Sequence, residues 1–158
     1  MFPSLIFSYG IVLMLAFILK KKKMHMLEIV FVWMISIFIY NNLAFLAVLN
    51  YSLIKIPDHN HGFLAYENFR LLIVPLSIIW FLDVNSSFSS LGRKVINTLG
   101  FILLMCSFDY LLEKFRIVTY TESWNMNYSI GFYLGLTLCI YVINAFFHKL
   151  FKKEVLQK

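Results

Sequence analysis

The chain has 158 residues, of which 61% are hydrophobic, 18% aromatic and only 14% charged, with a formal net charge of +6. Soluble domains average roughly 45–50% apolar and about 25% charged residues, and so short a chain could not bury this apolar excess in water. The composition excludes an ordinary soluble domain and predicts an integral membrane protein. Nucleic-acid binding is excluded as well, because the basic residues lie in short clusters beside apolar runs rather than on a basic face.

The first two apolar runs each predict a transmembrane helix. Residues 2–19 carry no charge and are followed directly by four lysines at 20–23, the reverse of the order in a cleaved signal peptide. We expect a helix over 2–19 with its amino end outside and its lysines in the cytoplasm. The second run is uncharged from 29 to 54. Because a span needs about 20 residues, we expect the second helix over 27–50.

The third run is short. Residues 71–82 would form only ~18 Å of helix against a ~30 Å hydrocarbon core. A span therefore has to include flanking polar residues, and we predict a helix over 63–83 that is kinked at Pro75. A re-entrant segment is the alternative, and it would invert the orientation of every later element.

Two more helices follow. The serine-rich stretch 84–94 predicts a cytoplasmic connector, and the apolar run after it reaches a spanning length only if it continues through Asp109, which gives a helix over 95–115. An outer loop then leads to a fifth helix over 128–147. Of the 14 Lys and Arg residues, ten lie on the predicted cytoplasmic side, at 20–23, 93, 94, 149, 152, 153 and 158, and four lie outside, at 55, 70, 114 and 116.

The sequence thus predicts an all-α bundle of five transmembrane helices. It forms a single domain over residues 1–158, with the amino end outside and the carboxyl end in the cytoplasm.

Depth along the predicted helices brings six polar residues to one level near the outer end: Asn41, Asn42, Glu67, Arg70, Asp109 and Glu113. Arg70 and Asp109 both fall ~10 Å below the outer boundary. Charges in hydrocarbon are costly unless they are paired or hydrated, so we predict a cluster in which Arg70 pairs with Asp109. The cluster is either a buried clasp that fixes helix register or a hydrated pocket for a small ligand, ion or proton.

Two further patterns have a packing or metal interpretation. Gly131 and Gly135 form a G-x-x-x-G, which predicts close helix packing, either within the bundle or between copies of the chain. The loop run Asp58-His59-Asn60-His61 is the nearest approach to a metal cluster, but no third and fourth ligand can be named. We therefore predict no metal and no cofactor. No metalloprotease, nucleophile-elbow, phosphate-loop or dinucleotide motif is present.

A set of spaced residues resembles a known family. The run YENFRLLIVPL at 66–76, LEK at 112–114, Tyr120, Trp124 and Tyr128-Ser129 before a final apolar helix is similar to small uncharacterised multi-pass membrane proteins of Gram-positive spore-forming bacteria. The resemblance covers most of the chain after the first helix. It implies a bacterial plasma-membrane protein of about five helices, and it implies no activity and no catalytic residue.

Three functions remain open. A non-enzymatic cell-envelope component is favoured, with the lipid bilayer around it and a second copy or another membrane protein as partner. A small carrier or channel that uses the outer cluster is the alternative. An intramembrane enzyme acting on lipid would rest only on Asp109 and Glu113 as an acid/base pair.

Overall fold

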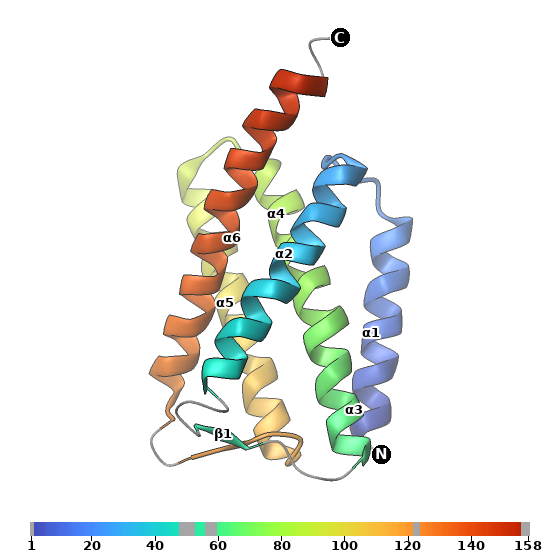
Figure 1. Cartoon of the computed structure of the whole chain (residues 1–158), viewed down its shortest axis with the longest axis vertical. Helices are drawn as coiled ribbons and strands as arrows, with labels where there is room; N and C mark the ends of the chain where they lie inside the picture. The colour runs from blue at the N-terminus through green and yellow to red at the C-terminus, as the bar shows by residue number, and fades with distance from the viewer. Residues whose placement is uncertain (1, 48–52, 56–59, 122–123, 156–158) are drawn as a thin grey trace.

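The computed structural model describes residues 2–47, 53–55, 60–121 and 124–155. Its helices are α1 (Phe2–Leu19), α2 (Met26–Phe45), α3 (Asn60–Asn68), the π-helical η2 (Phe69–Ile73), α4 (Val74–Ser86), α5 (Leu91–Lys114) and α6 (Met126–Val155). Because α3, η2 and α4 follow one another without a break, the described residues form five helices (Figure 1). The predicted all-α bundle of five helices is confirmed.

Four of these helices are long and apolar enough to cross a membrane. They cover Met26–Phe45, His61–Ser86, Leu91–Lys114 and Met126–Leu150, whereas the apolar part of α1, Ser4–Leu19, is shorter. Large hydrophobic side chains such as Met34, Leu103 and Phe146 stand exposed on the outside of the bundle. A surface of this kind suits lipid rather than water. A membrane span for α1 stays a prediction.

Pro75 is accommodated by a local change of helix type. Proline has no amide hydrogen, and in an α-helix its ring would clash with the carbonyl of Leu71, four residues earlier. Residues Phe69–Ile73, just before it, form a π-helical turn, which gives that carbonyl more room. The chain continues as one helix of 26 residues, His61–Ser86, or ~39 Å. This length favours a full span over the re-entrant alternative.

Several predicted boundaries need correction. The connector predicted at 84–94 is too long, because α4 continues to Ser86 and α5 already begins at Leu91. The Ser86 and Ser87 hydroxyls donate to the Asp83 carbonyl at 2.7 and 3.1 Å and so satisfy an acceptor at the helix end. α6 also extends beyond the predicted 128–147, since no helix-breaking residue follows Phe147. The predicted end of the second helix at 50 lies outside the described residues.

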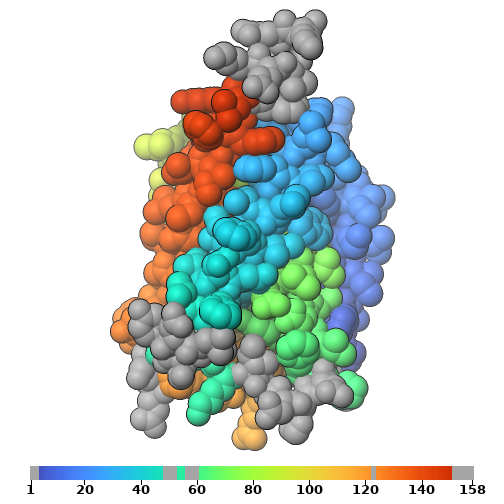
Figure 2. All heavy atoms as spheres, viewed as in Figure 1, coloured from blue at the N-terminus to red at the C-terminus, as the bar shows by residue number. Residues whose placement is uncertain are grey.

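The bundle has two chemically different ends. Three segments lie at one end of the bundle in Figure 1: the α1–α2 connector, the α4–α5 connector and the carboxyl end of α6. We call this the basic end, because it carries Lys20 and Lys23 in the first connector and Arg93 just after the second. The strand end holds the amino end of α1 and a short antiparallel pair, β1 (Ile54–Lys55) and β2 (Thr119–Tyr120). α2 packs against α4 and α6 and crosses the face shown in Figure 2 between α6 and α3.

The glycines of the predicted packing motif do not lie between helices of the bundle. Gly131 and Gly135 are exposed, and an added Cβ at either position would meet no atom within 4 Å. The packed face of α6 instead carries Tyr133, Leu136 and Ile140. Contact between copies of the chain through these glycines stays a prediction. Two helices approach each other closely at Gly10 of α1, where an added Cβ would stand 2.8 Å from Oδ1 of Asn68 in α3.

Candidate functional site

Asp109 and Glu113 lie one turn apart near the end of α5 and line a cleft of about 180 Å³ at the strand end. α5 stops just beyond them. Arg116 adopts the left-handed conformation with φ 54°, and the amides of Arg116 and Ile117 donate to the carbonyls of Glu113 and Leu112 at 2.8 and 2.9 Å. This pair of bonds is a Schellman motif. The chain reverses direction at this motif, and β2 (Thr119–Tyr120) follows within a few residues.

The carboxyl group of Asp109 is the centre of the cluster. Asp109 is only 7% exposed, and the hydroxyl of Tyr133 in α6 donates to its Oδ1 at 2.6 Å. The hydroxyls of Ser129 and Tyr120 approach the same carboxyl group. Charge-assisted hydrogen bonds of this length are strong. Asp109 therefore joins α5 to α6 and to β2.

Tyrosines extend the cluster to α2 and α3. The hydroxyl of Tyr40 lies between those of Tyr133 and Tyr66, and all three tyrosines are buried. The cavity enclosed by these rings and Asp109 measures about 20 Å³, which is room for about one water molecule. The inner part of the cluster is packed, whereas its outer side, with Asp109 and Glu113, borders the wider cleft.

The hairpin positions one more hydroxyl and an aromatic wall. Tyr120 is held opposite Ile54 in the two-stranded pair, and its ring stacks on Trp124 with centroids 5.4 Å apart. Trp124 Nε1 in turn donates to Ser129 Oγ at 3.0 Å. Burial, and then the nearby Asp109 carboxylate, raise the pKa of Tyr120 above its ordinary value. Its hydroxyl therefore keeps its proton and remains a donor.

The predicted Arg70–Asp109 pair does not form. Arg70 Nη2 lies 2.7 Å from Glu67 Oε2, three residues earlier on the same helix, and its guanidinium stands 6.0 Å from the ring centre of Tyr66. An acid at i,i+3 is within reach without crossing the bundle. Asp109 takes tyrosine hydroxyls instead, so the basic residue touches the cluster only at the ring of Tyr66.

The two asparagines also lie apart from Asp109. Asn42 is exposed and donates to the Phe38 carbonyl of its own helix at 2.7 Å, while the buried Oδ1 of Asn41 has no hydrogen-bond partner among the described residues. The residues by which α2 reaches the cluster are Tyr40 and Ala44. Charged and amide residues in the sequence did not indicate the tyrosines, although the positions of the tyrosines at matching depths in several helices could have done so.

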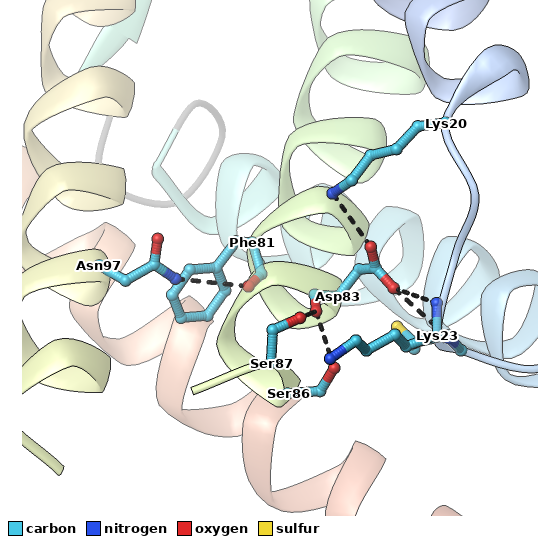
Figure 3. A network of polar contacts seen from close by, with 8 residues as sticks. Lys20, Lys23, Phe81, Asp83, Ser86, Ser87 and Asn97 are labelled. Atoms are coloured by element: carbon cyan, nitrogen blue, oxygen red, sulfur yellow. Dashed lines mark hydrogen bonds and ion pairs between the residues drawn. The ribbon is translucent and has the colours of Figure 1, made fainter. Parts of the chain in front are cut away.

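A second polar network lies at the basic end, where the sequence indicated only flanking charges. Asp83 is 4% exposed and points from α4 toward the α1–α2 connector (Figure 3). Its carboxylate accepts from the Lys23 amide at 2.8 Å and the Met24 amide at 3.4 Å, and it forms an ion pair with Lys20 at 3.1 Å. These contacts fix the connector, and with it α1, to the end of α4.

Glu28 is the other buried acid of this end. Its carboxylate accepts from the His25 amide at 3.1 Å, which caps α2, and also pairs with His148 of α6. A metal centre is not formed here or elsewhere in the described part of the chain, which holds no group of three His, Cys, Asp or Glu side chains suited to an ion. Of the loop run considered for metal binding, Asp58 and His59 lie outside the described residues.

Comparison with known proteins adds no assignment, because no protein-family model, curated protein or solved structure matches the chain. The resemblance to a family of bacterial membrane proteins stays a prediction.

Asp109→Leu should destabilise the protein by about 1–3 kcal/mol, because the buried Tyr133 hydroxyl loses its acceptor. Asp109→Asn keeps an oxygen acceptor of the same shape and should cost less. Thermal unfolding of the purified protein in detergent measures both. Glu113→Gln is the matched control, since Glu113 is exposed at the cleft rim. Wild-type stability in Asp109→Leu would contradict the assigned role of the hydrogen bond.

Asp83→Leu should free the α1–α2 connector and cost about 1–3 kcal/mol, because two backbone amides lose their acceptor. Lys20→Met removes only a partly exposed ion pair, whose typical worth is about 0–1 kcal/mol. Hydrogen exchange of the peptide around Lys23, together with thermal unfolding, should show faster exchange in the Asp83 variant alone. Equal effects of the two substitutions would show that the ion pair, not the amide bonds, holds the connector.

Proposed function

We propose that this chain is a multi-pass integral protein of a bacterial plasma membrane and a non-enzymatic component of the cell envelope, in which the Asp109 cluster is a structural clasp. The observation that carries the clasp is the hydrogen bond that the buried Asp109 makes to another helix, together with the tight packing on its inner side. Its carboxyl group accepts from the fully buried Tyr133, and the adjoining cavity has room for only about one water molecule. A buried acid that is bonded across helices in this way fixes helix register.

The proposed orientation follows from charge. The basic end gathers the lysines before α2, Arg93 and Lys94 at the start of α5, and the lysines of α6, and short basic segments favour the cytoplasmic side. The strand end then lies outside. The resemblance to a family of bacterial membrane proteins supports a bacterial plasma membrane as the location.

The surroundings of such a component would be lipid and other membrane proteins. Exposed apolar side chains on α5 and α6 supply the lipid-facing surface. Gly131 and Gly135 lie on the exposed face of α6, where small residues would allow close approach of a second copy or of another membrane protein.

The cleft at the strand end favours a second candidate, a small carrier or channel for a cation. Asp109 and Glu113 supply negative charge to its wall, and Tyr120 and Trp124 supply aromatic rings. Acids and aromatic faces together attract cations. This candidate requires that a cation passes the packed tyrosines beyond Asp109.

Flux measurements in proteoliposomes test the clasp against the carrier. The clasp predicts no proton or alkali-cation flux above that of protein-free vesicles, and no difference between the wild type and Asp109→Asn, because that variant retains the packed shape. Glu67→Gln, outside the cleft, is the control for a change of charge alone. Flux that Asp109→Asn abolishes in a folded protein would reject the clasp and establish the carrier.

Cysteine accessibility tests the orientation independently of the clasp. In a background without Cys106 and Cys139, a cysteine at position 60 should react with an impermeant reagent added to whole cells. Cysteines at positions 22, 90 and 155 should react only after permeabilisation, because these positions belong to the basic end. External labelling at position 90 would contradict the proposed topology.

A further inference from the structure

A cavity of about 230 Å³ at the basic end lies apart from the Asp109 cluster and shares no lining residue with it. α2, α4, α5, α6 and the α1–α2 connector all contribute to its wall. Its volume is several times the ~30 Å³ that one water molecule occupies in the liquid. The lining includes the charged and amide residues Lys23, Glu28, Asn85, Lys94, Asn144 and His148 and the hydroxyl residues Ser86 and Tyr141.

Two asparagines of this wall have an amide oxygen without a hydrogen-bond partner among the described residues. Asn85 is only 5% exposed, and its Oδ1 has no hydrogen-bond partner among the described residues; the same is true of Asn144 Oδ1. Buried carbonyl oxygens of native proteins nearly always accept a hydrogen bond. Asn85 of α4 and Asn144 of α6 both line the cavity. Two unpartnered amide oxygens in residues of one cavity wall suit a ligand that carries hydroxyl or ammonium groups, with a small rotation of each side chain on binding.

The charge of the lining favours a negative ligand. Within the described part of the chain, neither the Lys23 nor the Lys94 ammonium group has an acid within ion-pair distance. The one acid of the lining, Glu28, already pairs with His148 and accepts from the His25 amide. Two lysines therefore remain to bind an anion at the cavity, and phosphate is a common partner of such ammonium groups.

We propose that this cavity binds a phosphate ester that carries hydroxyl groups, presented as the glycerol-phosphate headgroup of an anionic phospholipid. The phosphate accepts from Lys23 and Lys94, while the headgroup hydroxyls donate to Asn85 and Asn144. Glu28 repels the phosphate from its own wall and accepts only from hydroxyls, so it sets the orientation of the headgroup. Basic pockets between transmembrane helices at the cytoplasmic surface are typical of such lipid sites.

The choice among lipids follows from the same groups. A phosphatidylcholine headgroup has neither a donor for the amides nor a net negative charge. Phosphatidylethanolamine has donors but no net charge to match the lysines, whereas phosphatidylglycerol has both. The proposal rests on the membrane insertion proposed above and is independent of the role of Asp109.

Binding of short-chain phosphatidylglycerol, phosphatidylethanolamine and phosphatidylcholine to the purified full chain in detergent tests the proposal. Phosphatidylglycerol should bind most tightly and phosphatidylcholine most weakly. Lys94→Gln should weaken phosphatidylglycerol binding about tenfold through loss of a charge-assisted bond. Arg93→Gln is the matched control, because it removes the same charge from the neighbouring exposed position outside the lining and should leave the affinity nearly unchanged.

Asn85→Leu separates binding from folding. It should weaken phosphatidylglycerol binding while leaving the melting temperature of the lipid-free protein unchanged or higher, because it removes an unpaired buried oxygen. If Lys94→Gln does not fold, Lys23→Gln replaces it. Equal affinity for the three lipids would overturn the proposal, because the site would then recognise neither the charge nor the hydroxyls of the headgroup. Equal loss in Lys94→Gln and Arg93→Gln would overturn it in favour of general surface charge. Displacement of the lipid by an equal concentration of soluble glycerol phosphate would overturn the lipid source.

Discussion

The hydrogen bond from Tyr133 to Asp109 is the interaction on which the strand end depends. A carboxyl group inside an apolar bundle is costly unless donors surround it, and here the hydroxyl of Tyr133 meets it at 2.6 Å while those of Ser129 and Tyr120 approach it. Through Tyr40 the same contacts reach α2 and α3. One acid thus gathers four helices and the hairpin. The arrangement requires α5 to end just beyond Asp109, and the left-handed Arg116 provides that reversal.

The buried acids at the two ends of the bundle have hydrogen-bond partners of different kinds. This difference bears on function. Asp109 is held by neutral hydroxyls, whereas Asp83 and Glu28 are held by basic side chains and backbone amides. Between the ends, the buried polar side chains of the described part are small hydroxyls, those of Ser36, Ser77 and Thr137. The cavities of the two ends share no lining residue. A continuous polar path is therefore missing from the described bundle, which supports a clasp over a conduction pathway.

The sequence predicted which segments are helices and how deep each residue lies in the membrane. It did not predict the direction in which each side chain points about its helix axis. The run lengths predicted five helices and brought Asp109 to its level, because a hydrocarbon core fixes how far a residue can lie from a helix end. Depth alone does not select a partner: Arg70, Asn42 and Tyr133 are all compatible with it, and only Tyr133 faces Asp109. The reversal after α5 was equally hidden, since the left-handed position is usually glycine and here is arginine. No sequence pattern marked Asn85 and Asn144, whose amide oxygens have no partner among the described residues.

The π-helical turn before Pro75 changes which residues of this helix share a face. A π-helical turn takes about one residue more than an α-helical turn, so residues on its two sides are rotated by ~100° relative to a regular helix. The faces of α3 and α4 therefore do not continue one another as they would in a regular helix. In the folded chain Tyr66 faces Asp109 before the turn, and Asp83 and Asn85 face the basic end after it. Arg70, inside the turn, is left to pair with Glu67. One helix with a π-helical turn before Pro75 thus supplies buried polar groups to both ends of the bundle.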